Sequence, residues 1–158
     1  MKLKTWAQRL FPKHARVPMI TVALLHFVFY FIPPLLVKGE YHYDLTVFID
    51  GYIPFVPIFI IFYIGAYLQW GISYIWHFSK SRSLSVRLAC ADLLTKAVAA
   101  LFFIFLPTVM LQPVPGDGVF AFLVKVIYFF DEPVNLFPSL HCAASWLCFR
   151  SAFPVRHS

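Results

Sequence analysis

Long stretches without any charged side chain restrict this chain more than any other feature. Residues 17–37 contain no Asp, Glu, Lys or Arg over 21 positions, and residues 53–78 contain none over 26. About 20 apolar residues are enough for an α-helix to cross the roughly 30 Å hydrocarbon core of a bilayer. A third stretch, residues 88–111, carries Asp92 and Lys96 in its first half and no charge after them. We therefore expect three membrane-spanning helices.

The composition agrees with an integral membrane protein. Charged residues make up 13% of the chain, against about a quarter of a typical soluble domain. We expect an all-α helical bundle, with a basic segment at residues 1–16 and one membrane domain over residues 17–158. After the three full spans, an outer loop at 113–137 includes an apolar stretch, residues 119–130, that favours a short interfacial helix. A partial fourth helix over residues 139–153 is too short to span a bilayer alone.

The placement of charge predicts how the chain crosses the membrane. Residues 1–16 carry five basic and no acidic side chains, and residues 79–96 carry four basic against one acidic. Residues 38–52 and 113–137 each carry three acidic side chains against one basic. Since Lys and Arg accumulate in cytoplasmic loops, we expect a multi-pass protein of the cell membrane with its amino terminus in the cytoplasm.

The same features limit the cofactors and partners that we expect. Cys90, Cys142 and Cys148 are odd in number and lie among apolar residues, which does not favour a disulfide framework or a zinc site. The net charge of +6 follows from the basic cytoplasmic segments, so it does not indicate nucleic acid. We expect no metal or other cofactor, and membrane lipids as partners.

One short motif combines a hydroxyl with an imidazole at a predicted helix start. Pro138, Ser139, Leu140 and His141 precede an apolar run, and Ser is a preferred N-cap residue. The first N–H groups of a helix lack intrahelical acceptors and lie at the positive end of the helix dipole, which favours anions. A phosphate bound there would be within reach of Ser139 and would be protonated by His141.

The residues around this motif resemble a known family. The segment Asp-Glu-Pro-Val-Asn-Leu-Phe-Pro-Ser-Leu-His at residues 131–141, together with residues 50–57 and Gly-Asp-Gly at 116–118, is similar to the type 2 phosphatidic acid phosphatase superfamily. The likeness covers about two-thirds of the chain and is greatest to bacterial membrane members related to inositol phosphorylceramide synthases. It implies a lipid-phosphate phosphatase or phosphotransferase that works through a phosphohistidine, without metal, at the outer membrane face. It also implies that the chain forms the first part of a six-helix bundle.

The resemblance assigns roles to particular residues. His141 would be the catalytic acid that protonates the leaving group, while Ser139 would bind phosphate with the neighbouring backbone N–H groups. The family's Lys-x6-Arg-Pro motif falls on residues 105–113, where Phe105 and Gln112 replace the two cations, so Gln112 would contact phosphate without neutralising it. Asp131 and Asn135 would shape the loop before the motif, or act as ordinary turn residues that bond their own backbone.

A third family motif, Ser-Arg-x5-His-x3-Asp, has no counterpart after His141. Because that motif supplies the attacking histidine, we expect a chain that is truncated after the second motif and inactive alone, with a missing carboxy-terminal half or a homo-oligomer as possible completions. A non-catalytic protein that binds phospholipid headgroups or a partner helix is the alternative. A small transporter or channel subunit, suggested by the number of spans and by His26, is the third reading.

Two polar positions inside the spans have structural explanations. Asp92 and Lys96 stand one helical turn apart, which favours an i,i+4 pair with Lys96 extending toward water. His26 lies within the first span, where we expect a hydrogen bond to a neighbouring helix.

Overall fold

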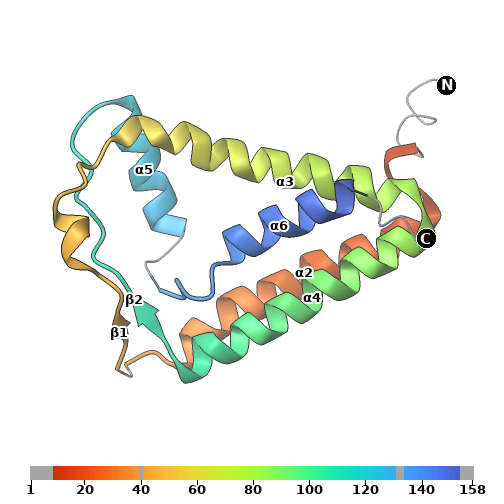
Figure 1. Cartoon of the computed structure of the whole chain (residues 1–158), viewed down its shortest axis with the longest axis horizontal. Helices are drawn as coiled ribbons and strands as arrows, with labels where there is room; N and C mark the ends of the chain where they lie inside the picture. The colour runs from red at the N-terminus through yellow and green to blue at the C-terminus, as the bar shows by residue number, and fades with distance from the viewer. Residues whose placement is uncertain (1–8, 40, 131–133, 154–158) are drawn as a thin grey trace.

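Three long helices dominate the structure, a computed structural model that describes residues 9–39, 41–130 and 134–153. Helix α2 covers Lys13–Leu36, α3 covers Ile60–Lys80 directly after the 3-10 turn η2 at Pro57–Phe59, and α4 covers Arg82–Phe105. Each of the three is long and apolar enough to cross a membrane. The fold is thus all-helical apart from short extended segments, as the apolar runs predict (Figure 1).

The first two spans lie close to their predicted positions, whereas the third does not. Helix α4 begins at Arg82, six residues before the predicted start at 88, and follows α3 after the single residue Ser81. The Ser81 side chain caps α4 by accepting a hydrogen bond from the Leu84 N–H at 3.2 Å. Residues 82–87, which were expected to precede the third span, are therefore helical. Charge alone does not prevent a helix when a serine cap is available, and Asp92 and Lys96 farther along α4 pair with each other.

Helices α2, α3 and α4 pack together through small and apolar side chains. Helix α4 contacts both of the other long helices, and α2 and α3 also contact each other. A central cluster of buried residues joins the three helices: Ala15, Val22, Phe78, Leu88 and Ala89. The small residues in this cluster, Ala15 and Ala89, let helix backbones approach closely, which is the usual basis of packing inside a membrane.

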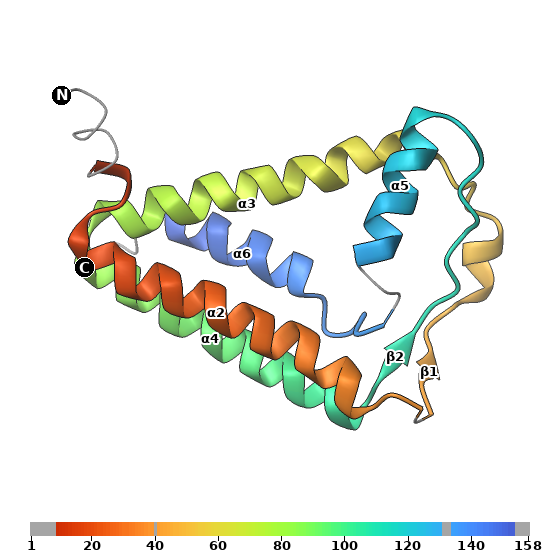
Figure 2. The ribbon, with the colours of Figure 1, turned by 180° about the vertical axis from the view of Figure 1, so that it is seen from behind.

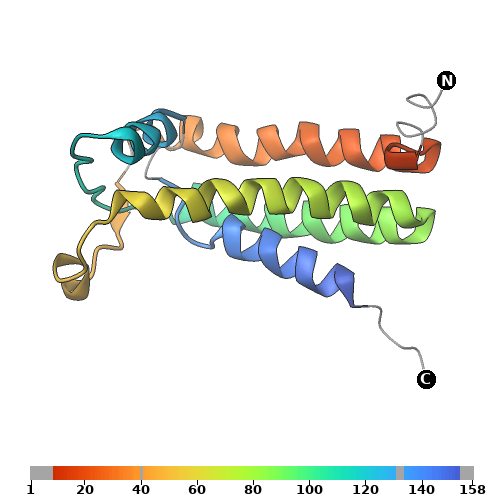
Figure 3. The same ribbon diagram turned by 90° about the horizontal axis from the view of Figure 1, so that it is seen from above.

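The predicted fourth helix is present and short. Helix α6 covers Leu140–Ala152, 13 residues, or roughly 20 Å. It lies between α3 and α4 and contacts both of them (Figure 1). Trp70 of α3 donates a hydrogen bond to Ser145 of α6 at 3.0 Å. Helix α6 therefore begins beside the first turns of α3, and Figure 3 shows that the two helices run in the same general direction.

The remaining elements gather at one end of the bundle, here called the loop end (Figure 2). Strand β1 at Tyr43–Asp44 pairs in parallel with β2 at Thr108–Val109, and the 3-10 turn η1 covers Phe48–Gly51. Helix α5 covers Val119–Phe130, which confirms a helix at residues 119–130. The start of α3 lies at this same end, and α6 begins farther inside the bundle with its first residue toward the loop end, as the view from behind shows (Figure 2).

A polar cluster lies within the spans, away from the loop end. Lys96 and Asp92 form the predicted i,i+4 ion pair at 2.6 Å, and Tyr74 of α3 donates a hydrogen bond to the other Asp92 oxygen at 2.5 Å. The Lys96 side chain is 12% exposed and the Asp92 side chain 2%. The expectation that Lys96 extends toward water is therefore wrong, because its carboxylate partner is itself buried between α3 and α4.

His26 also differs from its expected environment. Its ring stacks on Tyr30 of the same helix with ring centroids 5.7 Å apart. Within the described part of the chain, the buried Nδ1 atom has no hydrogen-bond partner. The predicted hydrogen bond to a neighbouring helix is therefore wrong for this nitrogen, since an aromatic neighbour one turn away covers the ring.

Candidate functional site

The start of α6 has the capped geometry that the motif predicts. Ser139 has extended backbone angles, φ −71° and ψ 111°, and its side chain accepts a hydrogen bond from the Cys142 N–H at 3.3 Å. Leu140 is the first helical residue. The Ser139 cap is thus confirmed, and the first turn of α6 places His141 next to it.

Two tyrosines of α3 lie against the His141 imidazole. Its Nε2 atom is 3.0 Å from the Tyr63 hydroxyl and 3.2 Å from the Tyr67 hydroxyl, and the two hydroxyls are 3.2 Å apart. The Trp70 ring packs against the imidazole with ring centroids 5.2 Å apart. Since Tyr63, Tyr67 and Trp70 follow one another at helical spacing, one face of α3 holds the imidazole in place.

A cavity of about 410 Å³ opens at the loop end beside this imidazole. Four of the residues singled out in the sequence line it: Gln112, Asn135, Ser139 and His141. They come from the loop after β2, the segment before α6 and α6 itself, so the fold brings together positions up to 29 residues apart. We call this space the headgroup cavity.

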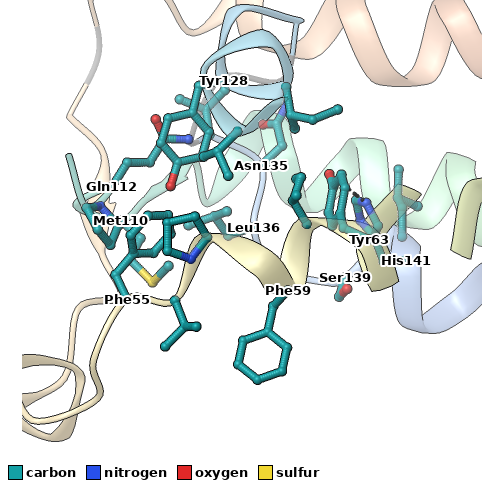
Figure 4. Close-up of a pocket in the computed structure, with 18 of the residues that line it drawn as sticks. Phe55, Phe59, Tyr63, Met110, Gln112, Tyr128, Asn135, Leu136, Ser139 and His141 are labelled. Carbon is teal, nitrogen blue, oxygen red and sulfur yellow. Dashed lines mark hydrogen bonds between the residues drawn. The ribbon is translucent and has the colours of Figure 1, made fainter. Parts of the chain in front are cut away.

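Figure 4 shows how these side chains are distributed. Tyr63 and His141 lie at one end of the headgroup cavity with Ser139 nearby, Gln112 lies at the other end, and Asn135 lies between them (Figure 4). Gln112 therefore shares the cavity with His141 without being its neighbour. A group bound at the start of α6 would meet Ser139 and His141 first, and Gln112 would contact a more distant part of the ligand.

Asn135 has a backbone conformation that suits it for a turn. Its φ is +61°, in the left-handed region that Asn adopts more readily than most residues. Its N–H donates to the Thr108 carbonyl at 3.2 Å, and its buried Oδ1 has no hydrogen-bond partner among the described residues. Asn135 thus both adopts a turn conformation and lines the cavity. Asp131, the other loop candidate, lies outside the described residues.

Thr108 holds the segment that leads into α6, although sequence analysis did not single it out. Its buried hydroxyl oxygen accepts hydrogen bonds from the Leu136 N–H at 3.0 Å and the Phe137 N–H at 3.3 Å. Val109, next to it, forms an antiparallel bridge with Val134. Strand β2 therefore fixes the segment before Ser139, through the Thr108 hydroxyl and the bridge at Val109.

The headgroup cavity is uncharged over the residues that the structure describes. Apart from the four polar candidates and tyrosines, its lining is apolar, and no Lys, Arg, Asp or Glu belongs to it. Tyr128 of α5 is one of the lining tyrosines, and burial raises the pKa of its hydroxyl above the ordinary value. Tyr128 is therefore a neutral hydrogen-bonding group at physiological pH. The arrangement offers neutral donors, an imidazole and a helix start to a ligand.

Sequence reasoning found the candidates of the Pro-Ser-Leu-His segment but missed Tyr63 and Tyr67. Their spacing of four residues was a visible signal for a shared helix face, yet aromatic residues are frequent throughout this chain, at 20%. No family model, curated protein or solved structure matches the chain significantly. The function of the site therefore has to be inferred from its own residues and geometry.

Proposed function

We propose that this membrane protein binds the phosphate of a lipid headgroup at the start of α6, as a relative of the lipid-phosphate phosphatases and phosphotransferases. The observation that carries the proposal is the convergence of Gln112, Asn135, Ser139 and His141 on one cavity. A helix start is a suitable anion site, because the first N–H groups of a helix have no intrahelical acceptor and lie at the positive end of the helix dipole. The three helices long enough to span a membrane make a membrane lipid the natural source of that anion.

The geometry near His141 supports a role as a proton donor to a departing oxygen. The imidazole lines the headgroup cavity one position after Leu140, the first residue of α6. In a phosphotransfer reaction, a nucleophile would form a new bond to phosphorus while the P–O bond to the leaving group breaks, and His141 would give its proton to that oxygen. Ser139 and the first N–H groups of α6 would hold the non-bridging oxygens.

A second candidate function, binding without turnover, is favoured by a specific observation. Among the residues that line the described cavity, His141 is the single imidazole, and no cationic side chain is present. The attacking histidine of the proposed family would have to come from elsewhere, because His141 already serves as the acid. We therefore propose that the residues of this chain bind lipid phosphate and do not turn it over by themselves.

We expect the purified protein in lipid nanodiscs to bind phosphatidic acid more tightly than diacylglycerol, which lacks the phosphate. His141→Ala should weaken phosphatidic acid binding about tenfold, or about 1.4 kcal/mol, because a hydrogen-bonding group beside the anion is lost. Gln112→Leu should have a smaller effect, since Gln112 lies at the other end of the cavity (Figure 4). Binding of fluorescent phosphatidic acid, titrated with unlabelled lipid, measures all three.

The matched control is His42→Ala, because His42 precedes β1 at the loop end and does not line the cavity. Equal binding of phosphatidic acid and diacylglycerol would contradict the proposal. Phosphate release above that of empty nanodiscs, abolished by His141→Ala, would favour the enzyme over the binding protein and would require a nucleophile that we have not identified.

We further propose that the amino terminus lies in the cytoplasm and the loop end outside, because the starts of α2 and α4, with Lys13, Arg16 and Arg82, lie at the opposite end (Figure 1). In a chain whose native cysteines are replaced, Cys at Asp117 should react with an impermeant thiol reagent in intact cells. Cys at Ser83, at the start of α4, should react after the membrane is opened. The two positions are exposed, so accessibility to the reagent depends on the side of the membrane. The reverse labelling pattern would place the headgroup cavity in the cytoplasm.

A further inference from the structure

A second cavity lies between α4 and α6, within the spans. Its volume is about 370 Å³, and its wall on α4 includes Leu94, Val98 and Ala99. The facing wall includes Leu140 and Ala143 of α6. We call this space the lateral groove, because Leu94 is 68% and Val98 44% exposed on the side of the bundle.

The lateral groove lies at the depth of hydrocarbon chains. Its α4 residues precede the end of α4 at Phe105 by 6 to 11 positions, which corresponds to roughly 9 to 16 Å along the helix. One leaflet of a bilayer contributes about half of the roughly 30 Å hydrocarbon core. In the proposed orientation, these residues face the chains of the outer leaflet.

The chemistry of the groove also matches hydrocarbon. Leu, Val, Ala and Pro side chains make up most of its lining. Thr95 is one polar residue there, and its hydroxyl donates a hydrogen bond to the Ala91 carbonyl of its own helix at 2.8 Å. Because this hydroxyl is already bonded, an apolar chain can lie against it without leaving a donor unsatisfied.

The groove and the headgroup cavity meet at the start of α6. Ser139 and Leu140 line both spaces. A phosphate at Ser139 would therefore have the headgroup cavity on one side and the groove on the other. This continuity selects one occupant for the groove, because a lipid is the molecule that joins a phosphate to a hydrocarbon chain.

We propose that the lateral groove binds a hydrocarbon chain of the same lipid whose phosphate lies at Ser139 and His141. The proposal rests on the proposed function and extends it, since it assigns the chain-binding subsite and a lateral route of entry from the bilayer between α4 and α6. The remainder of the headgroup then lies in the headgroup cavity, toward Gln112. A water-soluble phosphate would use the first site alone.

Filling the groove tests this assignment. Ala143→Phe should weaken binding of long-chain phosphatidic acid about tenfold and change binding of glycerol 3-phosphate by no more than about twofold. The preference of the protein for the long-chain lipid over glycerol 3-phosphate is then lost. Val98→Phe, at a partly exposed wall position, provides a second variant that does not alter α6. Ala152→Phe is the matched control, since Ala152 is exposed near the end of α6. Binding is measured in detergent micelles by competition with fluorescent phosphatidic acid.

The outcomes separate the groove from the function on which it rests. Long-chain binding that is unchanged in both Ala143→Phe and Val98→Phe would overturn the groove proposal while the headgroup site stands. Failure of the unaltered protein to bind either phosphate compound would overturn the proposed function itself. A photoreactive benzoylphenylalanine at Val98, irradiated in nanodiscs, should attach to phosphatidic acid. Attachment to a second copy of the chain would instead show that the groove is an interface between proteins.

Discussion

Lys96→Met is expected to lower the free energy of unfolding by roughly 3 to 5 kcal/mol. Lys96 is paired with Asp92 at 2.6 Å, and the Asp92 side chain is 2% exposed in the middle of α4. Removing the ammonium leaves a buried carboxylate whose remaining described contact is the Tyr74 hydroxyl. Unfolding with increasing SDS in mixed micelles measures the change.

The double variant Asp92→Asn, Lys96→Met separates charge from packing. Asparagine keeps an oxygen that accepts the Tyr74 hydrogen bond, so the double variant should regain most of the stability that Lys96→Met loses. Lys125→Met is the exposed control, because Lys125 is 3.9 Å from Asp117 and its side chain is 52% exposed. Lys125→Met should change the free energy of unfolding by less than about 1 kcal/mol. If the double variant loses as much stability as Lys96→Met alone, an unpaired buried charge does not explain the loss.

The sequence predicts the spans well because their physical cause is local. An uncharged run long enough to cross a bilayer has few alternatives to a helix, since lipid provides no partners for backbone polar groups. The start of α4 could not be predicted in the same way. Arg82, Arg87 and Asp92 suggested a solvated loop, but the Ser81 cap and the partners of Asp92 on Tyr74 and Lys96 permit a helix. The contact between Asp92 and Tyr74 of α3 depends on how the two helices pack, which the periodicity of the sequence does not predict.

The site shows the same division between local and distant causes. The Ser139 cap follows from residue preferences over a few positions, and the structure contains it. The contacts of His141 with Tyr63 and Tyr67 join positions 78 and 74 residues apart. Thr108 is separated from Leu136 by 28 residues. Neither set of contacts has a local sequence pattern, because each depends on how α3, α4 and α6 pack.

Thr108→Val is expected to detach the segment before α6 and weaken lipid-phosphate binding about tenfold. Valine has nearly the shape of threonine but lacks the oxygen that accepts from the Leu136 and Phe137 N–H groups. Leaving those donors without an acceptor costs about 2 kcal/mol, which corresponds to a roughly 30-fold increase in local opening. Hydrogen exchange at the two amides should accelerate accordingly, and binding of phosphatidic acid should fall because Ser139 and His141 lose their fixed position.

Thr46→Val tests whether any threonine hydroxyl in the loops has this effect. The Thr46 oxygen accepts from the Leu111 N–H at 3.4 Å, but the pair is exposed, so water replaces the lost partner. Binding of phosphatidic acid by the Thr46→Val variant should stay within about twofold of that by the unaltered protein. If Thr108→Val accelerates exchange at Leu136 and Phe137 while binding is unchanged, the start of α6 does not hold the phosphate. If both measurements change together, the hydrogen bonds to the Thr108 hydroxyl of β2 position the anion site, and the loop end acts as one unit with α6.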